Sequence, residues 1–142
     1  MNEKQRKPTL NDYLAGAVLT NGLVWIWLRL LGSLGGITSN AYLGILSLST
    51  LVICLLSSTL ASYQVCRRAQ AEQLLVGMKA AGLAWLFSPF IIFPIIQGAF
   101  VNVAIILLVC FSLGGVAGAY LATKARLRRL REGAARHEKE DF

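Results

Sequence analysis

A long, almost uncharged block constrains the fold of this chain more than any other feature. After Glu72, the only charged residue before Lys124 is Lys79. A helix rises about 1.5 Å per residue, so about 20 residues cross the roughly 30 Å apolar core of a bilayer. The block is therefore too long for one membrane helix. It predicts two spans that turn back on each other.

The composition also indicates a membrane protein. The 142 residues are 56% hydrophobic and 15% charged, whereas soluble domains carry about 25% charged residues. The charges gather in three places: the N-terminus, Arg67–Arg68 and the tail from residue 124. Nucleic-acid binding uses a basic face on a soluble fold, so no nucleic-acid partner is expected.

Four spans are predicted, at about residues 10–31, 41–66, 72–88 and 99–123. Arg67 and Arg68 end the second span, and the Ser88-Pro89 pair is expected to end the third, because a residue before proline is biased away from helix. Residues 89–98 either lie along the interface or extend the third span past a kink. The prediction is an all-α polytopic membrane protein, a four-helix bundle of two hairpins within residues 10–123.

Basic residues orient these spans, because they stay on the cytoplasmic side of a membrane. The N-terminal segment 1–9, the Arg67–Arg68 turn and the basic tail 124–142 all carry Lys or Arg. An even number of spans places all three on one side. The chain is therefore predicted to be integral to a plasma membrane, with both termini in the cytoplasm.

Small residues recur at four-residue intervals in the second and fourth spans. Residues four apart share a helix face, and small side chains let membrane helices approach closely. The two patches are expected at the same depth and facing each other at the centre of the bundle; a contact between molecules is the alternative. The predicted packing residues are Ser57, Ser58, Ala61, Ser62, Gly114, Gly115, Gly118, Ala119 and Ala122.

The two halves of the chain share a sequence pattern. Gly22 to Trp25 (GLVW) matches Gly82 to Trp85 (GLAW), and the two small-residue patches are each followed by tyrosine and, four residues later, a basic residue. Both matches run in the same direction, which indicates a parallel internal repeat about an axis along the membrane normal. The alternative is that the small alphabet of membrane helices produces such matches by itself.

Three polar residues within spans are candidates for function, because ionisable and amide groups are costly in lipid. Asn21 is expected to bond to another helix, with substrate binding as the alternative. Arg29 and Lys79 are expected to extend to water, and Lys79 could also pair with Glu72. No Asp, Glu or His lies in a span interior, so no catalytic or metal site and no cofactor is expected.

The tail begins with a run of five basic residues, Lys124, Arg126, Arg128, Arg129 and Arg131. It is expected to continue the fourth helix, and its charge fits attraction to anionic lipids of the inner leaflet, at about 1 kcal/mol per residue. Two alternatives are a flank that only sets topology and a docking site for an acidic partner. The predicted partners are the bilayer and either another membrane protein or a second copy of the chain.

The second and fourth spans end in Leu60-Ala-Ser-Tyr63 before Arg67, and in Gly114 to Leu121 before Lys124. This pattern resembles a broad group of small uncharacterised four-helix membrane proteins of bacteria and archaea. The resemblance covers most of the chain, implies a prokaryotic plasma membrane protein and assigns no functional residue. The predicted function is that of a non-enzymatic accessory or structural subunit acting through helix–helix contacts. The alternative is a small transporter or channel formed by dimerisation.

Overall fold

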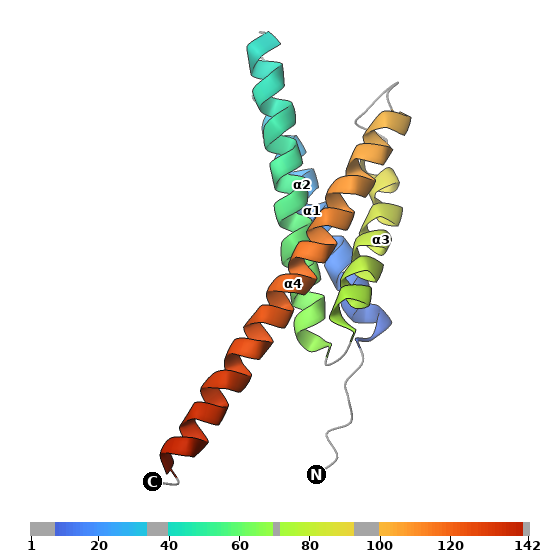
Figure 1. Cartoon of the computed structure of the whole chain (residues 1–142). Helices are drawn as coiled ribbons and strands as arrows, with labels where there is room; N and C mark the ends of the chain where they lie inside the picture. Colours follow the sequence, from blue (N-terminus) through green and yellow to red (C-terminus); the bar gives the residue numbers. More distant parts are fainter. Residues whose placement is uncertain (1–7, 34–39, 70–71, 93–99, 141–142) are drawn as a thin grey trace.

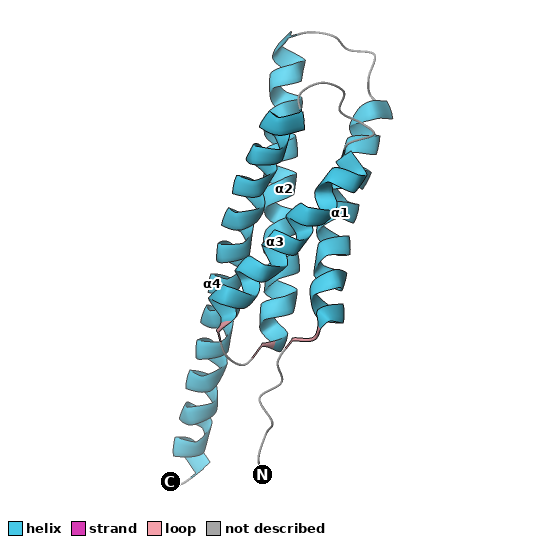
Figure 2. Ribbon diagram, turned by 90° about the vertical axis from the view of Figure 1, so that its right-hand side faces the viewer, coloured by secondary structure: helices cyan, strands magenta, loops and turns pink. Residues whose placement is uncertain are grey.

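The computed structural model describes residues 8–33, 40–69, 72–92 and 100–140. Within these residues the chain is all α, with α1 (Leu10–Ser33), α2 (Asn40–Arg68), α3 (Gln73–Ile92) and α4 (Phe100–Glu140). The start of α1, the end of α2, the start of α3 and the C-terminal half of α4 lie at one end of the molecule (Figures 1 and 2). Predictions for residues 1–7, 34–39, 93–99 and 141–142 fall outside the described residues.

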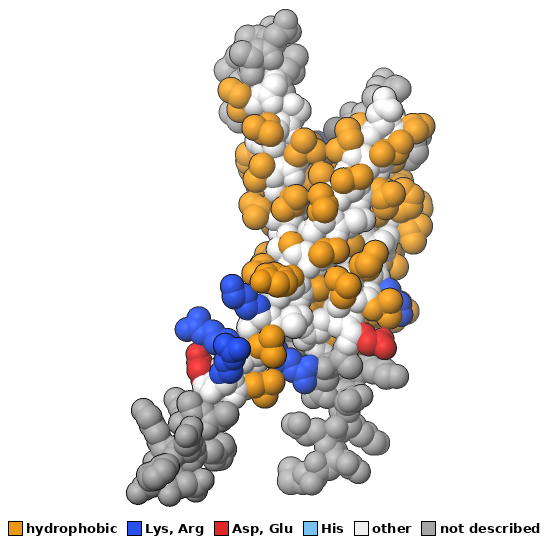
Figure 3. Space-filling model, in the orientation of Figure 1, with side chains coloured by type: hydrophobic (Ala, Val, Ile, Leu, Met, Phe, Trp, Pro, Cys, Tyr) orange, Lys and Arg blue, Asp and Glu red, His pale blue; other side chains and the backbone are white. Residues whose placement is uncertain are grey.

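Three helices are long and apolar enough to cross a membrane, over Leu10–Ser33, Ser47–Arg68 and Val101–Gly133. Large apolar side chains cover the outside of the described bundle, such as Val18 at 69% exposed and Val101 at 67% (Figure 3). A soluble monomer rarely exposes apolar surface on this scale, whereas lipid is its natural solvent. The chain is therefore consistent with an integral membrane protein.

Small residues fill the inside of the bundle. Among the buried residues are Ala17, Ala61, Ala81 and Ala119, and Phe111 is the largest fully buried side chain. Helices packed through alanine and glycine approach more closely than helices packed through leucine. The distribution thus reverses that of a water-soluble bundle, with bulk outside and small residues at the contacts.

Helix α4 packs on α2 and α3, and α1 packs on the same two helices. In the described part of the chain, no Cα atom of α1 lies within 8 Å of one in α4. A parallel repeat would make the α1–α4 pair equivalent to the α2–α3 pair, which is in contact. The two halves are therefore not packed equivalently, and the repeat stays a prediction.

Helix α3 continues through Pro89 to Ile92, so the predicted helix end at Ser88 is wrong. Proline lacks the N–H that would bond the carbonyl of Trp85, four residues earlier. The hydroxyl of Ser88 donates to that carbonyl at 2.7 Å instead. In lipid a side chain that satisfies a freed backbone group lets a helix tolerate proline. Of the two paths predicted for residues 89–98, extension of the third span is the one seen up to Ile92.

Helix α4 continues from the predicted fourth span into the tail, as far as Glu140. Its 41 residues correspond to about 60 Å, twice the roughly 30 Å of a bilayer core. The predicted helical continuation of the tail is confirmed. The C-terminal part of α4 projects beyond the other three helices (Figure 1).

The Ser88 bond predicts non-additive substitutions. Ser88→Ala should lower the free energy of unfolding by about 1 kcal/mol, because it leaves the Trp85 carbonyl unpaired. In a Pro89→Ala background the restored N–H can bond that carbonyl, so Ser88→Ala should cost less there. Unfolding in a detergent titration, followed by circular dichroism, measures both. An equal loss in the two backgrounds would contradict this account.

Candidate functional site

Gly114 and Gly118 of α4 lie directly against α2. A Cβ atom built on Gly114 would stand 2.6 Å from Cβ of Ser58, and one built on Gly118 would stand 2.8 Å from Cβ of Ser62. Non-bonded carbon atoms pack at about 3.5–4.0 Å, so neither position has room for a side chain. The structure thus brings together four of the predicted packing residues where α2 and α4 cross (Figure 1).

Gly115 lies on the neighbouring face of α4, against α3. A Cβ atom built on Gly77 would stand 2.6 Å from the carbonyl oxygen of Gly115 and 3.0 Å from Cβ of Ala119. A Cβ atom on Gly115 would stand 2.9 Å from Cβ of Ala81. The glycine-rich stretch of α4 therefore serves two helices at once, with Gly114 and Gly118 towards α2 and Gly115 and Ala119 towards α3.

Gly77 is a packing residue absent from the sequence prediction. Its spacing from Ala81 is the same four-residue interval that marks the other patches. Ala122, which was predicted, is 4% exposed and belongs to a buried cluster that includes Val76 and Ala80 of α3. The four-residue rule applied to α3 would have found its half of this contact.

Two hydroxyl groups of the α2 patch bond to backbone carbonyls. Ser58 donates to the carbonyl oxygen of Phe111 in α4 at 2.9 Å, and Ser57 donates to that of Cys54 in its own helix at 3.0 Å. Ala61 is buried at 3% exposed, and its carbonyl oxygen would lie 3.9 Å from a Cβ atom on Gly16 of α1. The patch therefore contacts α4 on one side and α1 on the other.

Asn21 makes the hydrogen bond to another helix that was expected of it. Its Nδ2 donates to the carbonyl oxygens of Ala17 at 2.9 Å and Ala84 of α3 at 3.0 Å. The side chain is fully buried, and among the described residues its Oδ1 has no hydrogen-bond partner. Both N–H donors of the Asn21 amide are used in these bonds. The contact between α1 and α3 therefore fixes the orientation of the amide.

The other two polar candidates do not join Asn21 in one site. The Arg29 guanidinium lies over the Trp25 ring, 5.2 Å from its centroid, near the end of α1. Lys79 is exposed near the start of α3, and no ion pair joins it to Glu72 in the described part of the chain. Since α1 and α3 run in the same direction, the two cations lie at opposite ends of the bundle (Figure 1).

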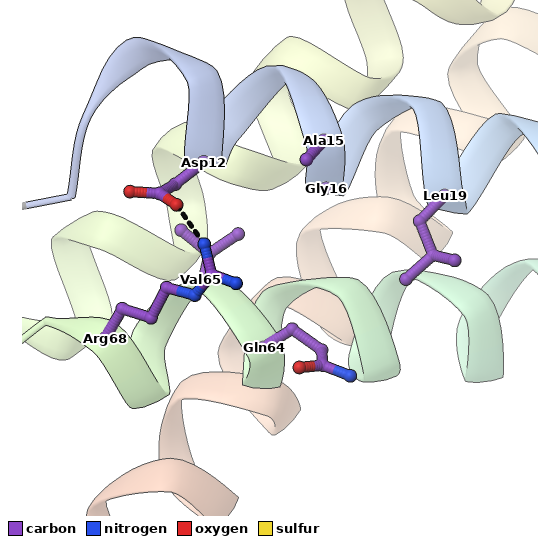
Figure 4. Close-up of a pocket in the computed structure, with 7 residues that line it drawn as sticks. All are labelled: Asp12, Ala15, Gly16, Leu19, Gln64, Val65 and Arg68. Carbon is purple, nitrogen blue, oxygen red and sulfur yellow. Dashed lines mark hydrogen bonds and ion pairs between the residues drawn. The ribbon is translucent and has the colours of Figure 1, made fainter.

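An ion pair between Asp12 and Arg68 joins the start of α1 to the end of α2 (Figure 4). The Asp12 carboxylate also accepts hydrogen bonds from the backbone N–H of Thr9 at 2.9 Å and from its hydroxyl at 3.0 Å, which fixes the first turn of α1. This pair is absent from the sequence prediction, although oppositely charged residues at adjoining ends of an antiparallel helix pair are its signal. It borders a groove of about 250 Å³, lined by Asp12, Ala15, Gly16, Leu19, Gln64, Val65 and Arg68.

The five basic residues predicted in the tail are exposed along α4 where it leaves the bundle. Lys and Arg side chains gather on this part of the molecule, below the apolar surface (Figure 3). Arg128 donates from Nε to Glu132 at 3.0 Å, and both side chains are open to solvent. Such an exposed pair contributes little to stability, so the Arg128 guanidinium can also bind other groups.

No group of three His, Cys, Asp or Glu residues that could hold a metal ion occurs among the described residues. Cys54 and Cys66 are buried and Cys110 is half-buried, all as free thiols. No family model, no curated protein and no solved structure matches this chain. Its function is therefore inferred from its packing and its surface.

The contact of Gly77 with Gly115 predicts opposite outcomes for two substitutions in α3. Gly77→Ala should lower the free energy of unfolding by about 1–3 kcal/mol, because the methyl group would overlap α4. Gly82→Ala, in the same helix, meets no atom within 4 Å and should raise it by up to about 1 kcal/mol through helix propensity. A detergent unfolding titration compares them. Equal effects would show that α3 and α4 do not meet at Gly77.

Proposed function

We propose that this chain is a non-enzymatic integral protein of a prokaryotic plasma membrane, with four spans in two hairpins and both termini in the cytoplasm. Helix α3 would be the span that brings the number from three to four. Lys79 is the only charged residue among its 20 residues, and α3 packs against the three other helices. Arg67, Arg68 and the basic tail support the orientation, since basic flanks stay inside.

We further propose that the protein is an accessory or structural subunit that binds another membrane protein, or a second copy of itself, through helix contacts. Two glycines carry this proposal. A Cβ atom built on Gly22 of α1 or on Gly82 of α3 meets nothing within 4 Å. Glycine within a helix costs about 1 kcal/mol relative to alanine. No contact inside the described chain explains that cost at either position.

The two glycines lie on adjoining helices. Asn21, beside Gly22, bonds to the carbonyl oxygen of Ala84, two residues beyond Gly82. Both positions are partly exposed, so lipid or a partner covers them. A helix of another molecule could approach either backbone closely there, as small residues allow in membranes. The Gly114 and Gly118 face, in contrast, is already occupied by α2.

The buried polar groups support a structural role over catalysis or transport. The buried polar residues of the described chain are Thr20, Asn21, Ser57, Ser58, Ser62 and Ser88. All except Ser62 donate to backbone carbonyls. The alternative of a transporter or channel formed by dimerisation would need these same groups to line a polar path.

Substituting the two open glycines should remove a partner without unfolding the chain. Wild-type protein extracted in mild detergent should migrate as a complex of fixed stoichiometry, identified by native mass spectrometry. Gly22→Leu with Gly82→Leu should release the monomer without lowering its unfolding midpoint, because both side chains have room and leucine favours a helix over glycine. Gly44→Leu is the matched control, because Gly44 of α2 is also open. Gly118→Leu should unfold the chain itself, since its side chain would overlap α2.

A wild-type chain that is monomeric and free of other proteins would contradict the accessory role. So would a double glycine variant that keeps its partner. A homo-oligomer that conducts ions or solutes in liposomes would favour the channel alternative instead.

A further inference from the structure

A groove of about 570 Å³ lies beside the crossing of α2 and α4, on the side where the two helices diverge (Figure 1). One end of the groove is apolar, with Leu56 and Leu60 from α2 and Leu121 from α4. All three leucines are substantially exposed, at 46–56%. This part lies within the segments that are long and apolar enough to cross a membrane. An occupant of this end must therefore be apolar and come from the bilayer.

The other end of the groove is basic. Lys124 and Arg128, one helical turn apart on α4, line it together with Tyr63 of α2. None of the residues that line the groove carries a carboxylate. Lys124 forms no hydrogen bond or ion pair with another described residue. Arg128 uses its Nε on Glu132, outside the groove, and a guanidinium has four further N–H donors for an anion.

The change from apolar to basic occurs at the depth where α2 ends in Arg67 and Arg68. This is the level expected of lipid headgroups if basic flanks lie at the membrane surface. An apolar surface that leads up to two adjacent cations matches an acyl chain attached to a phosphate. A free phosphate would leave the leucines uncovered, and an acidic peptide would not reach into the bilayer core.

We propose that this groove binds one anionic phospholipid of the inner leaflet. Lys124 and Arg128 hold its phosphate, and an acyl chain lies along Leu56, Leu60 and Leu121. The site differs from general attraction to a basic tail, because only two of the five tail cations line the groove. Arg126 and Arg129 project from other faces of α4, about 200° and 140° around the helix from Lys124 at 3.6 residues per turn.

This inference goes beyond the accessory role and does not depend on it. Both walls of the groove belong to helices long and apolar enough to cross a membrane. The site is complete within one chain, so lipid binding can be measured on the purified protein with no partner present. Loss of the proposed partner and loss of lipid binding are thus separate results.

The test titrates phosphatidylglycerol or phosphatidylcholine into the detergent-purified full chain at 0.15 M salt and counts bound lipids by native mass spectrometry. Wild type should bind one phosphatidylglycerol in preference to phosphatidylcholine. Lys124→Gln with Arg128→Gln should weaken that binding about ten- to thirty-fold, as expected for two cations near a headgroup. Arg126→Gln with Arg129→Gln removes the same charge and should stay within about two-fold of wild type.

A third variant tests the acyl seat without changing charge. Leu121→Trp fills the apolar end of the groove and should also weaken phosphatidylglycerol binding, with the unfolding midpoint checked for every variant. Equal losses in the two charge variants would overturn the site in favour of diffuse attraction to the tail. Equal affinity of wild type for the two lipids, or full binding by a folded Leu121→Trp variant, would overturn it as well.

Discussion

The close approach of α4 to its two neighbours is the contact on which the bundle depends. Apolar side chains gain little by leaving lipid for one another, so membrane helices associate through close packing and hydrogen bonds. At the glycines of α4 the backbones come near enough for Ser58 to bond the Phe111 carbonyl at 2.9 Å. On the other side, Trp85 of α3 donates from Nε1 to the Ala104 carbonyl at 2.9 Å. A side chain at Gly114 or Gly115 would push α4 outwards and open these bonds.

The same packing decides where the charge of the protein lies. Helix α4 crosses α2 at its glycines and then diverges from it, so that the C-terminal part of α4 projects beyond the other three described helices (Figure 1). The five tail cations follow the glycines directly in sequence, so they fall on this projecting part. The angle between α2 and α4 therefore determines where the basic C-terminal part of α4 lies, and it leaves a groove between the two helices.

Much of this arrangement could be predicted from sequence, because it depends on local pattern. Apolar length placed the helices, and four-residue spacing marked the faces that hold Ser58 and Gly114. What sequence could not supply depends on contacts between distant segments. The spacing does not say that Gly114 meets α2 while Gly115 meets α3. The Asp12–Arg68 pair requires the ends of α1 and α2 to adjoin. Helix α3 passes Pro89 because a neighbouring serine replaces one hydrogen bond.

The two small-residue patches of the predicted repeat differ in the size of their side chains. If the small-residue patches correspond, Ser58 of α2 stands where α4 has Gly115, and Ala61 stands where α4 has Gly118. Glycine at both faces would leave no hydroxyl to bond across the crossing, and serine at both would hold the backbones apart. One helix therefore supplies the side chain and the other the space for it. At Gly22 and Gly82, which the repeat would match, a Cβ atom meets nothing within 4 Å in the described chain, and the proposed partner contact depends on these two positions.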